Sequence, residues 1–304
     1  MTGGSDGQIL IYNENLTLVH SFQAHSKSIT RLKQSPSNNF ANEMNLAASS
    51  SSDTTVKIWS SLNWTLIRTY SNHTASVEAL EWINEDLIAS GGSFDQTIQI
   101  WSISTGQTKR IIQTWFFYVM SLKLLSNQIH LAAGFGQGPI SVYNINTGDL
   151  VVTLQGHTAN VNDIILVNQI YLASSSNLFE NTVRLWDLAK NETKFILTGH
   201  VSGVFGLKQI ASDLLASGSF DSTIKVWNLT TGGLIRTLKG HKSAILNSID
   251  LINNGQVLVS GSQDKTLKLW NWKTGECLNT KDTSGTAIQT LNVFNPIKSK
   301  KKFN

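Results

Sequence analysis

The stretch "GSFDSTIKVW" at residues 218–227 decides the fold, because it recurs along the chain. A near copy, "GSFDQTIQIW", stands at residues 92–101, and a third, "GSQDKTLKLW", at residues 261–270. The first half of each copy holds turn-forming residues, and the second half alternates polar and apolar residues as a half-buried β-strand does. Repetition of such a unit is the sequence signature of a repeat protein.

Two periodic patterns extend this repeat over the whole chain. Strands of this kind end on an aromatic residue every 41 to 47 residues, at Tyr12, Trp59, Trp101, Tyr143, Trp186, Trp227 and Trp270. Eighteen residues after each of the last six comes a β-branched residue, at Val77, Val119, Val161, Val204, Ile245 and Ile288. Because the two patterns stay in step, the sequence indicates seven equivalent units.

Each unit is predicted to form four short strands. In residues 199–241 we expect them at Gly203–Gln209, Leu214–Ser217, Thr223–Asn228 and Leu234–Lys239. A Gly-His dipeptide precedes the first strand in three units, at Gly156–His157, Gly199–His200 and Gly240–His241, and a Trp-Asp dipeptide stands at Trp186–Asp187. With these motifs the chain resembles the WD-repeat β-propeller family over nearly its whole length.

The resemblance implies an all-β fold, a seven-bladed β-propeller of four-stranded antiparallel blades. The N-terminal "MTGGSDGQILIY" fits a second and a third strand, and "TAIQTLNVF" at residues 286–294 fits a first strand. We therefore expect the two ends of the chain to pair in one blade, which closes the ring and removes an exposed sheet edge. We expect a single propeller domain over residues 1–296 and a basic, disordered tail over residues 297–304.

Charge and cysteine content narrow the classes of function. The formal net charge is +4, and Lys298, Lys300, Lys301 and Lys302 near the C-terminus account for it, so we do not expect a basic face that binds nucleic acid. Cys277 is the only cysteine, which excludes a disulfide framework within the chain. The sequence shows no signal peptide, membrane span, metal motif or cofactor motif. We expect a cytoplasmic or nuclear protein that uses no cofactor.

Histidine, serine, aspartate and tryptophan recur at matching positions, and we call each set a tetrad. One interpretation is the Ser-His-Asp relay of a hydrolase. The other is a buried hydrogen-bond chain from His through Ser and Asp to the indole N–H, which ties the loops of a blade to its sheet. Repetition favours the structural role, and the resemblance implies it, so we expect no catalytic residues. The sets are His25, Ser49, Asp53 and Trp59; His200, Ser217, Asp221 and Trp227; His241, Ser260, Asp264 and Trp270; and the partial set His73, Asp95 and Trp101.

The unit that ends at Tyr143 departs from this pattern. Trp115 occupies the histidine position, and Ala133 and Gln137 occupy the serine and aspartate positions. The aromatic run continues through Phe116, Phe117 and Tyr118. These rings either fold inward and replace the lost hydrogen bonds, or they face solvent.

Other aromatic residues precede the aspartate position, at Phe94, Phe179 and Phe220, where other units have small or polar residues. In a four-stranded meander, the loop that enters the first strand and the loop between the second and third strands lie on one face, which we call the top face. Phe205 and Leu246, just inside first strands, would add to this surface. The alternative is that the phenyl rings pack between blades.

We therefore expect a non-catalytic scaffold that binds partner peptides or helices on an aromatic top face. A monomeric propeller within a larger complex, with a protein partner and no membrane, fits this interpretation. One alternative is a substrate receptor or adaptor of a ubiquitin-ligase complex. Another is a component of a ribonucleoprotein or RNA-processing assembly, in which the aromatic rings would stack on bases.

Overall fold

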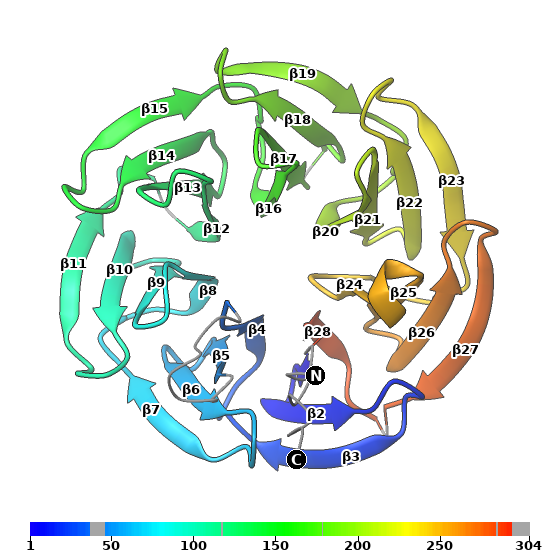
Figure 1. The fold of residues 1–304 in the computed structure, drawn as a ribbon, viewed down its shortest axis with the longest axis horizontal. Coiled ribbons are helices and arrows are strands. Elements are labelled where there is room, and N and C mark those ends of the chain that lie inside the picture. The colour runs from blue at the N-terminus through cyan, green and yellow to red at the C-terminus, as the bar shows by residue number, and fades with distance from the viewer. Residues whose placement is uncertain (37–45, 117, 178, 284, 294–304) are drawn as a thin grey trace, which may run out of the picture.

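The computed structural model describes residues 1–36, 46–116, 118–177, 179–283 and 285–293. Its seven four-stranded antiparallel sheets surround a central axis, as Figure 1 shows. The predicted all-β, seven-bladed propeller is therefore confirmed. The basic tail, residues 297–304, lies outside the described residues, so its predicted disorder stays a prediction.

Six blades follow the chain in order from the innermost to the outermost strand. The first three consist of β4 (Ile29–Gln34), β5 (Leu46–Ser51), β6 (Val56–Ser60) and β7 (Leu66–Tyr70); β8 (Val77–Trp82), β9 (Leu87–Gly92), β10 (Thr97–Ser102) and β11 (Thr108–Gln113); and β12 (Val119–Leu124), β13 (His130–Phe135), β14 (Ile140–Asn144) and β15 (Leu150–Leu154). The next three consist of β16 (Val161–Val167), β17 (Tyr171–Ser176), β18 (Val183–Asp187) and β19 (Glu192–Leu197); β20 (Val204–Ala211), β21 (Leu214–Ser219), β22 (Thr223–Asn228) and β23 (Leu234–Lys239); and β24 (Ile249–Ile252), β25 (Val257–Gly261), β26 (Thr266–Asn271) and β27 (Glu276–Asp282). The strands β22 and β23 have the predicted bounds. The strand β21 ends two residues later than predicted, and β20 begins one residue later and ends two residues later.

The seventh blade joins the two ends of the chain. It consists of β28 (Ile288–Leu291), β1 (Thr2–Gly4), β2 (Gln8–Tyr12) and β3 (Leu18–Gln23), in that order. Thr2 pairs with Leu291 across the antiparallel ladder, and the Thr286 hydroxyl donates to Asp6 Oδ2 at 3.0 Å. The predicted closure by the N- and C-terminal strands is confirmed.

The core lies between neighbouring blades. Each middle strand buries side chains on both faces, so alternate residues of one blade meet those of the next. One such cluster joins Val183 and Leu185 of β18 to Val204 of β20 and Trp227 of β22. Through these contacts each blade packs on both sides against its two neighbours.

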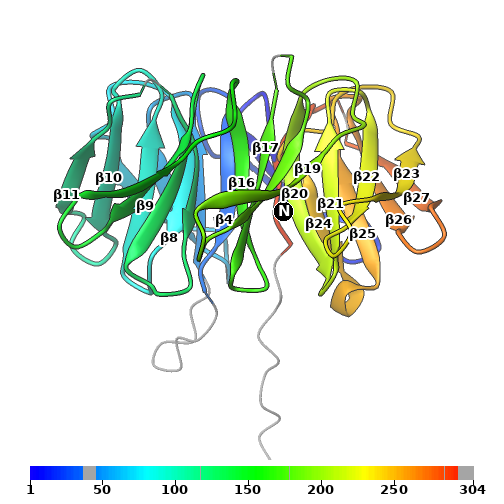
Figure 2. The same ribbon diagram turned by 90° about the horizontal axis from the view of Figure 1, so that it is seen from above.

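The loops divide between two faces, which Figure 2 shows from the side. The short η1 helix (Asn253–Gly255) joins β24 to β25 and lies on the lower face in that view. The top face defined above is the opposite, upper one. Within the described residues no helix is long and apolar enough to cross a membrane.

Candidate functional site

The tetrads form buried chains of hydrogen bonds. In the blade β20–β23, His200 Nδ1 lies 2.7 Å from Asp221 Oδ2 and His200 Nε2 lies 2.9 Å from Ser217 Oγ. The indole N–H of Trp227 donates to the same serine oxygen at 2.8 Å. The order is therefore Asp–His–Ser–Trp, and the expectation that aspartate bonds the indole is wrong, because serine separates the two. The same bonds join His25, Ser49, Asp53 and Trp59, and His241, Ser260, Asp264 and Trp270.

The electrostatics of the His25 tetrad favour a neutral histidine beside an ionised carboxylate. Burial outweighs the attraction of Asp53 and lowers the pKa of His25 to about 4. Burial alone would raise the pKa of Asp53, but the hydrogen bond from Thr55 and the nearby His25 outweigh it and lower the pKa to about 2. Ser217 is fully buried, so its hydroxyl cannot reach a substrate. This geometry supports the structural role over the relay.

A fourth complete tetrad uses glutamate in place of aspartate. His157 Nδ1 lies 2.9 Å from Glu180 Oε1, and Nε2 lies 2.7 Å from Ser174 Oγ, which accepts the Trp186 indole N–H at 2.7 Å. From the sequence, Glu180 is visible in place of the aspartate, but the set was not named as a tetrad, because two additional residues between Ser174 and Trp186 change the spacing. The Gly-His dipeptide and the closing tryptophan were the signals that identify it.

In the blade β8–β11 the tryptophan is not joined to the tetrad. His73 bonds Asp95 at 2.6 Å and Ser90 at 2.8 Å, but Trp101 Nε1 has no hydrogen-bond partner among the described residues. Its indole stacks instead on Tyr70 of the neighbouring blade, with ring centroids 4.2 Å apart and planes 1° from parallel. The set named from the sequence is thus corrected: Ser90 belongs to it and Trp101 does not.

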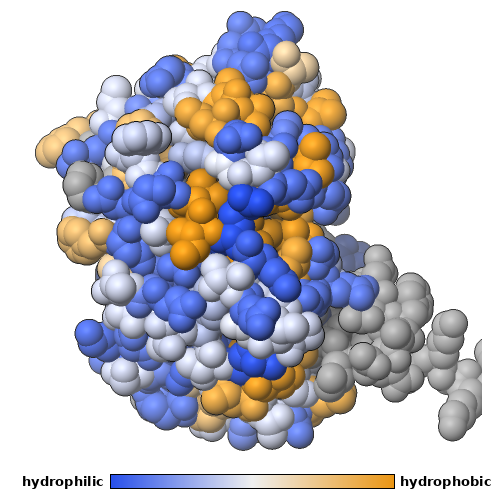
Figure 3. Space-filling model, turned by 90° about the vertical axis from the view of Figure 1, so that its left-hand side faces the viewer, coloured by the Kyte–Doolittle hydropathy of each residue, from blue (hydrophilic) through white to orange (hydrophobic). Residues whose placement is uncertain are grey.

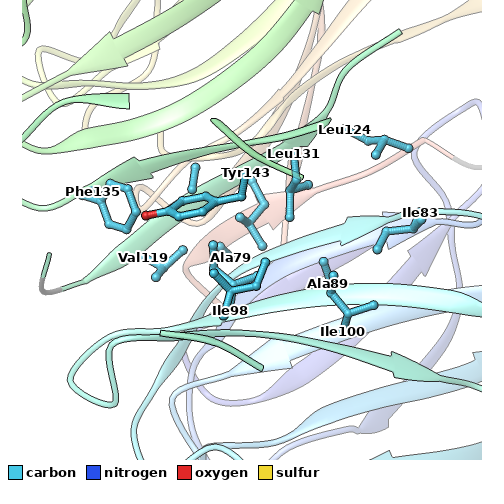
Figure 4. Close-up of a cluster of buried hydrophobic side chains, with 13 residues drawn as sticks. Ala79, Ile83, Ala89, Ile98, Ile100, Val119, Leu124, Leu131, Phe135 and Tyr143 are labelled. Atoms are coloured by element: carbon cyan, nitrogen blue, oxygen red, sulfur yellow. The ribbon is translucent and has the colours of Figure 1, made fainter. Parts of the chain in front are cut away.

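The blade β12–β15 replaces the tetrad with apolar packing. Phe135 is fully buried near Tyr143 and Val119, in the apolar cluster that Figure 4 shows. Phe116 is half-buried and packs against Phe135, with ring centroids 5.2 Å apart. Both alternatives for the aromatic run therefore apply to different residues, because Trp115 is 88% exposed. Phe117 lies outside the described residues.

The predicted top-face aromatic residues differ in exposure. Phe94, Phe179 and Phe220 are 64%, 99% and 48% exposed. Tyr118 is half-buried against Phe94, at a centroid distance of 4.6 Å. Phe205 is half-buried against Phe220, at 5.4 Å.

Leu246 does not join this exposed surface, because it is only 9% exposed. Its segment packs closely against β20, where a Cβ on Gly206 would lie 2.6 Å from the Leu246 carbonyl oxygen. Sequence reasoning also missed Val201, which is 83% exposed in the loop that enters β20. A valine directly after a Gly-His dipeptide, where Thr158 and Lys242 stand in other units, was the available signal.

The apolar residues occupy one part of the top face only. Trp115, Phe94, Phe179, Val201 and Phe220 come from loops of four neighbouring blades, β8–β11 to β20–β23. The equivalent loops on the other side of the ring carry exposed or half-exposed polar residues, at Ser26, Lys27, Ser52, Lys242 and Gln263. We call the five exposed apolar residues the aromatic arc.

The mouth of the central channel adjoins this arc. In six blades a β-bulge at the start of the first strand adds one unpaired residue, as between Ile29 and Arg31 or between Val77 and Ala79. Bulges re-aim side chains, and the equivalent residues of all seven blades line one cavity of about 220 Å³. They are Thr30, Glu78, Met120, Asn162, Phe205, Leu246 and Gln289.

Apolar side chains on the rim of the propeller follow the repeat instead. Outer strands expose residues such as Ile111, Leu150 and Ile235, each about half-exposed. Figure 3 shows separate hydrophobic patches between hydrophilic residues on one such side. Because nearly every blade has this feature, it does not single out one site.

Comparison with known families identifies the repeat. The sequence model of the family described as "WD domain, G-beta repeat" matches residues 16–60, 64–102, 148–187, 191–228 and 232–271, which is more than half of the chain. The chain belongs to the WD-repeat family. The segment 103–147, which contains most of the blade that lacks a tetrad, lies outside these matches. WD-repeat propellers commonly mediate protein–protein interactions and are typically non-catalytic scaffolds.

One solved structure gives an independent comparison of shape. The chain is similar to the crystal structure of the computationally designed Ika8 protein, with 26% sequence identity and a TM-score of 0.73. The match covers 96% of this chain and 86% of the designed one. No curated protein sequence matches the chain.

Proposed function

We propose that this WD-repeat propeller is a non-catalytic scaffold that binds a protein partner through the aromatic arc. The observation that carries the proposal is the exposure of five large apolar side chains on top-face loops of four neighbouring blades. Monomeric proteins rarely expose contiguous apolar patches without a binding role, and aromatic anchors dominate the binding energy of interfaces. A peptide or helix with apolar side chains matches this chemistry.

The backbone of the arc supports the same conclusion. Phe179 has φ 81°, and Tyr118, which packs against Phe94 of the arc, has φ 60°. Bulky residues rarely adopt positive φ, and such strained conformations cluster at binding sites. The strain displays the Phe179 ring almost completely to solvent.

The tetrads hold the loops of the arc in place. The Asp221 carboxylate that bonds His200 also accepts the backbone N–H of Val201, at 3.1 Å. Glu180, directly after Phe179, accepts the N–H of Thr158 at 3.0 Å and the Arg184 side chain at 3.0 Å. Loops fixed before binding lose less conformational freedom on binding, so this arrangement favours affinity.

The test is quantitative capture of partners by a triple variant, Phe94→Ala, Trp115→Ala and Phe220→Ala. A matched control, Ile111→Ala, Leu150→Ala and Ile235→Ala, removes comparably exposed side chains from the rim. We expect specific partners to remain with the wild type and the control and to be lost from the top-face variant, because each aromatic anchor contributes roughly 2 kcal/mol. Equal partner sets for all three proteins would overturn the proposal.

Salt dependence separates this proposal from nucleic-acid binding. An apolar peptide site should keep its affinity between low and moderate salt, whereas binding to phosphate backbones falls steeply with added salt. The identity of the captured proteins would test the ubiquitin-ligase alternative, because an adaptor subunit would appear among them.

A further inference from the structure

The central channel contains a second cavity that the proposed function does not use. It has a volume of about 370 Å³ and lies among the first strands of six blades, which Figure 1 shows around the axis. Ligand sites in proteins begin at roughly 300 Å³, so the cavity has room for a small ligand. Unlike the aromatic arc, it is lined by charged side chains.

Four cationic side chains line this cavity. Arg31 and Lys33 come from β4, Lys123 from β12 and Lys208 from β20. The Lys33 and Lys123 ammonium groups share one carboxylate, Glu81, which lies 3.0 Å from Lys33 Nζ. Lys208 is paired with Asp250. The three lysines therefore form ion pairs with only two carboxylates, Glu81 and Asp250.

The charge of Arg31 is attracted by the carboxylates of Asp163 and Glu78, but neither forms a close ion pair with it. Arg31 is only 8% exposed, and its guanidinium donates to the carbonyl oxygens of Met120 at 2.9 Å and Asn162 at 2.6 Å. Among the described residues it makes no ion pair with a carboxylate within 4.0 Å. Carbonyl oxygens satisfy its N–H groups but do not neutralise it.

Asp163 is a third carboxyl group near these cations, in addition to Glu81 and Asp250. Burial raises the pKa of Asp163, even though Arg31 and Lys33 act in the opposite direction. Its oxygens accept the backbone N–H groups of Leu207 at 2.9 Å and Ile164 at 3.0 Å. Four cationic side chains thus stand against three carboxyl groups, so positive charge is in excess even when Glu81, Asp163 and Asp250 are all ionised.

Among the described residues, these cations have more hydrogen-bond donors than their bonds use. A lysine ammonium has three N–H donors, and each of the three lysines uses one in the bonds described above. Arg31 uses three of its five donors, with Thr30 O as the third acceptor at 3.3 Å. A compact anion with several oxygens would satisfy donors from three strands at once.

We infer that the central channel binds a small polyvalent oxyanion of the phosphate class, held by Arg31, Lys33, Lys123 and Lys208. Charge-assisted hydrogen bonds to oxyanions are among the strongest polar contacts in proteins, and the partly buried setting strengthens them further. Arg31, on β4, lies just below the top end of the channel, where it donates to backbone oxygens of β12 and β16. Lys33 and Lys123 also line a further cavity of about 440 Å³ toward the lower face. The anion therefore approaches from the lower face and leaves the aromatic arc free.

The test is calorimetric titration of the full chain with pyrophosphate and, separately, inorganic phosphate at constant ionic strength. We expect saturable binding with one site per chain and a higher melting temperature in the presence of the anion. Lys123→Gln keeps the Lys33–Glu81 pair and should weaken pyrophosphate binding at least about tenfold. Lys242→Gln, at an exposed lysine of the top face, is the matched control and should bind as the wild type does.

Asp163→Asn keeps the shape of the carboxyl group and removes any negative charge, so it should bind pyrophosphate at least as tightly as the wild type. This second variant tests the inference even if Lys123→Gln fails to fold. Absence of saturable binding, or equal weakening by Lys123→Gln and Lys242→Gln, would overturn it. Binding of a phosphoserine peptide but of neither free anion would also overturn it, because the ligand would then be a phosphoprotein.

Discussion

Two blades of this propeller fix their top-face loops by different physical means. In β20–β23, the polar chain Asp221–His200–Ser217–Trp227 joins loop to sheet. In β12–β15, Ala133 and Phe135 stand where Ser217 and Ser219 stand in the other blade, and an apolar cluster fills the same region. The strands nevertheless pair in the same way, since Val119 lies opposite Phe135 as Val204 lies opposite Ser219.

This comparison shows that the tetrad is not required for the blade itself. Sheet pairing and burial between neighbouring blades determine the strand geometry, and the tetrad or the apolar cluster then determines how the loops are held. The difference also has a consequence for function, because the blade without histidine leaves Trp115 free to face solvent. Four predictions test the comparison.

The largest effect is expected from Phe135→Ala. The ring is fully buried in the cluster of Figure 4, and its removal should lower the free energy of unfolding by about 3–5 kcal/mol. The matched control is Ser219→Ala, which removes the hydrogen bond that Ser219 Oγ donates to Ser202 O and the one that it accepts from the Asp221 N–H. This change should lower the free energy of unfolding by roughly 1–2 kcal/mol. Urea unfolding measures the free energy of unfolding of both variants. An equal decrease in the two would contradict the view that the apolar cluster around Phe135 takes the place of the tetrad.

A smaller loss is expected from Ser217→Ala in the polar blade. The change leaves the Trp227 indole N–H and His200 Nε2 buried without a partner, and it should destabilise the protein by about 3 kcal/mol. The reverse change, Ala133→Ser, places a hydroxyl in an apolar environment and should also destabilise, by roughly 1–2 kcal/mol. A neutral Ser217→Ala variant would show that the tetrad does not stabilise its blade.

Acid should weaken the blade β4–β7, whose tetrad contains His25, before the apolar blade β12–β15. The folded pKa of His25, about 4, lies below its unfolded value of 6.5, so the unfolded chain binds more protons between these pH values and stability falls as the pH falls. The loss from His25 should reach about 2 kcal/mol at pH 5. The pKa of Asp53 is lowered from its usual value of 3.8 to about 2, so its protonation causes a further loss of stability as the pH falls below about 3.8.

Hydrogen exchange resolved by blade measures this effect. On acidification, after correction for the intrinsic exchange rate, amide protection should fall in β4–β7, which contains Ser49, Asp53 and Trp59. It should fall less in β12–β15, which has no tetrad. Equal loss of protection in both blades would mean that the histidines do not cause the acid sensitivity.

The sequence predicted the fold well because the signals that define it are local. A turn, an alternating strand and a closing aromatic residue recur in each unit, and Tyr12 and Ile288 place the closing blade in the same pattern. The site was less predictable because exposure depends on contacts between blades. Trp115 and Phe116 are adjacent in sequence, yet one faces solvent and the other packs on Phe135.

The tetrads show the same limit. Trp101 has the tetrad spacing, but Tyr70 of the neighbouring blade stacks on its ring. Other units have leucine at the position of Tyr70, at Leu154, Leu197 and Leu238, so the aromatic substitution was visible although its consequence was not. Glu180 shows the converse, because its longer side chain reaches the histidine that spacing alone did not assign to it.

The smallest effect on stability is expected from Trp115→Ala, and this prediction separates the surface of the apolar blade from its core. The side chain is 88% exposed, so its removal should change the free energy of unfolding by less than about 0.5 kcal/mol. Phe116→Ala, which removes a half-buried ring that packs on Phe135, is the comparison and should destabilise measurably more. Thermal and urea unfolding of the two variants check this directly.

A large loss of stability for Trp115→Ala would show that the indole packs against the propeller, and it would remove this residue from the aromatic arc. A near-neutral Trp115→Ala variant with weakened partner capture would instead show that the residue acts in binding alone, because the same blade keeps its loops through Phe116 and Phe135.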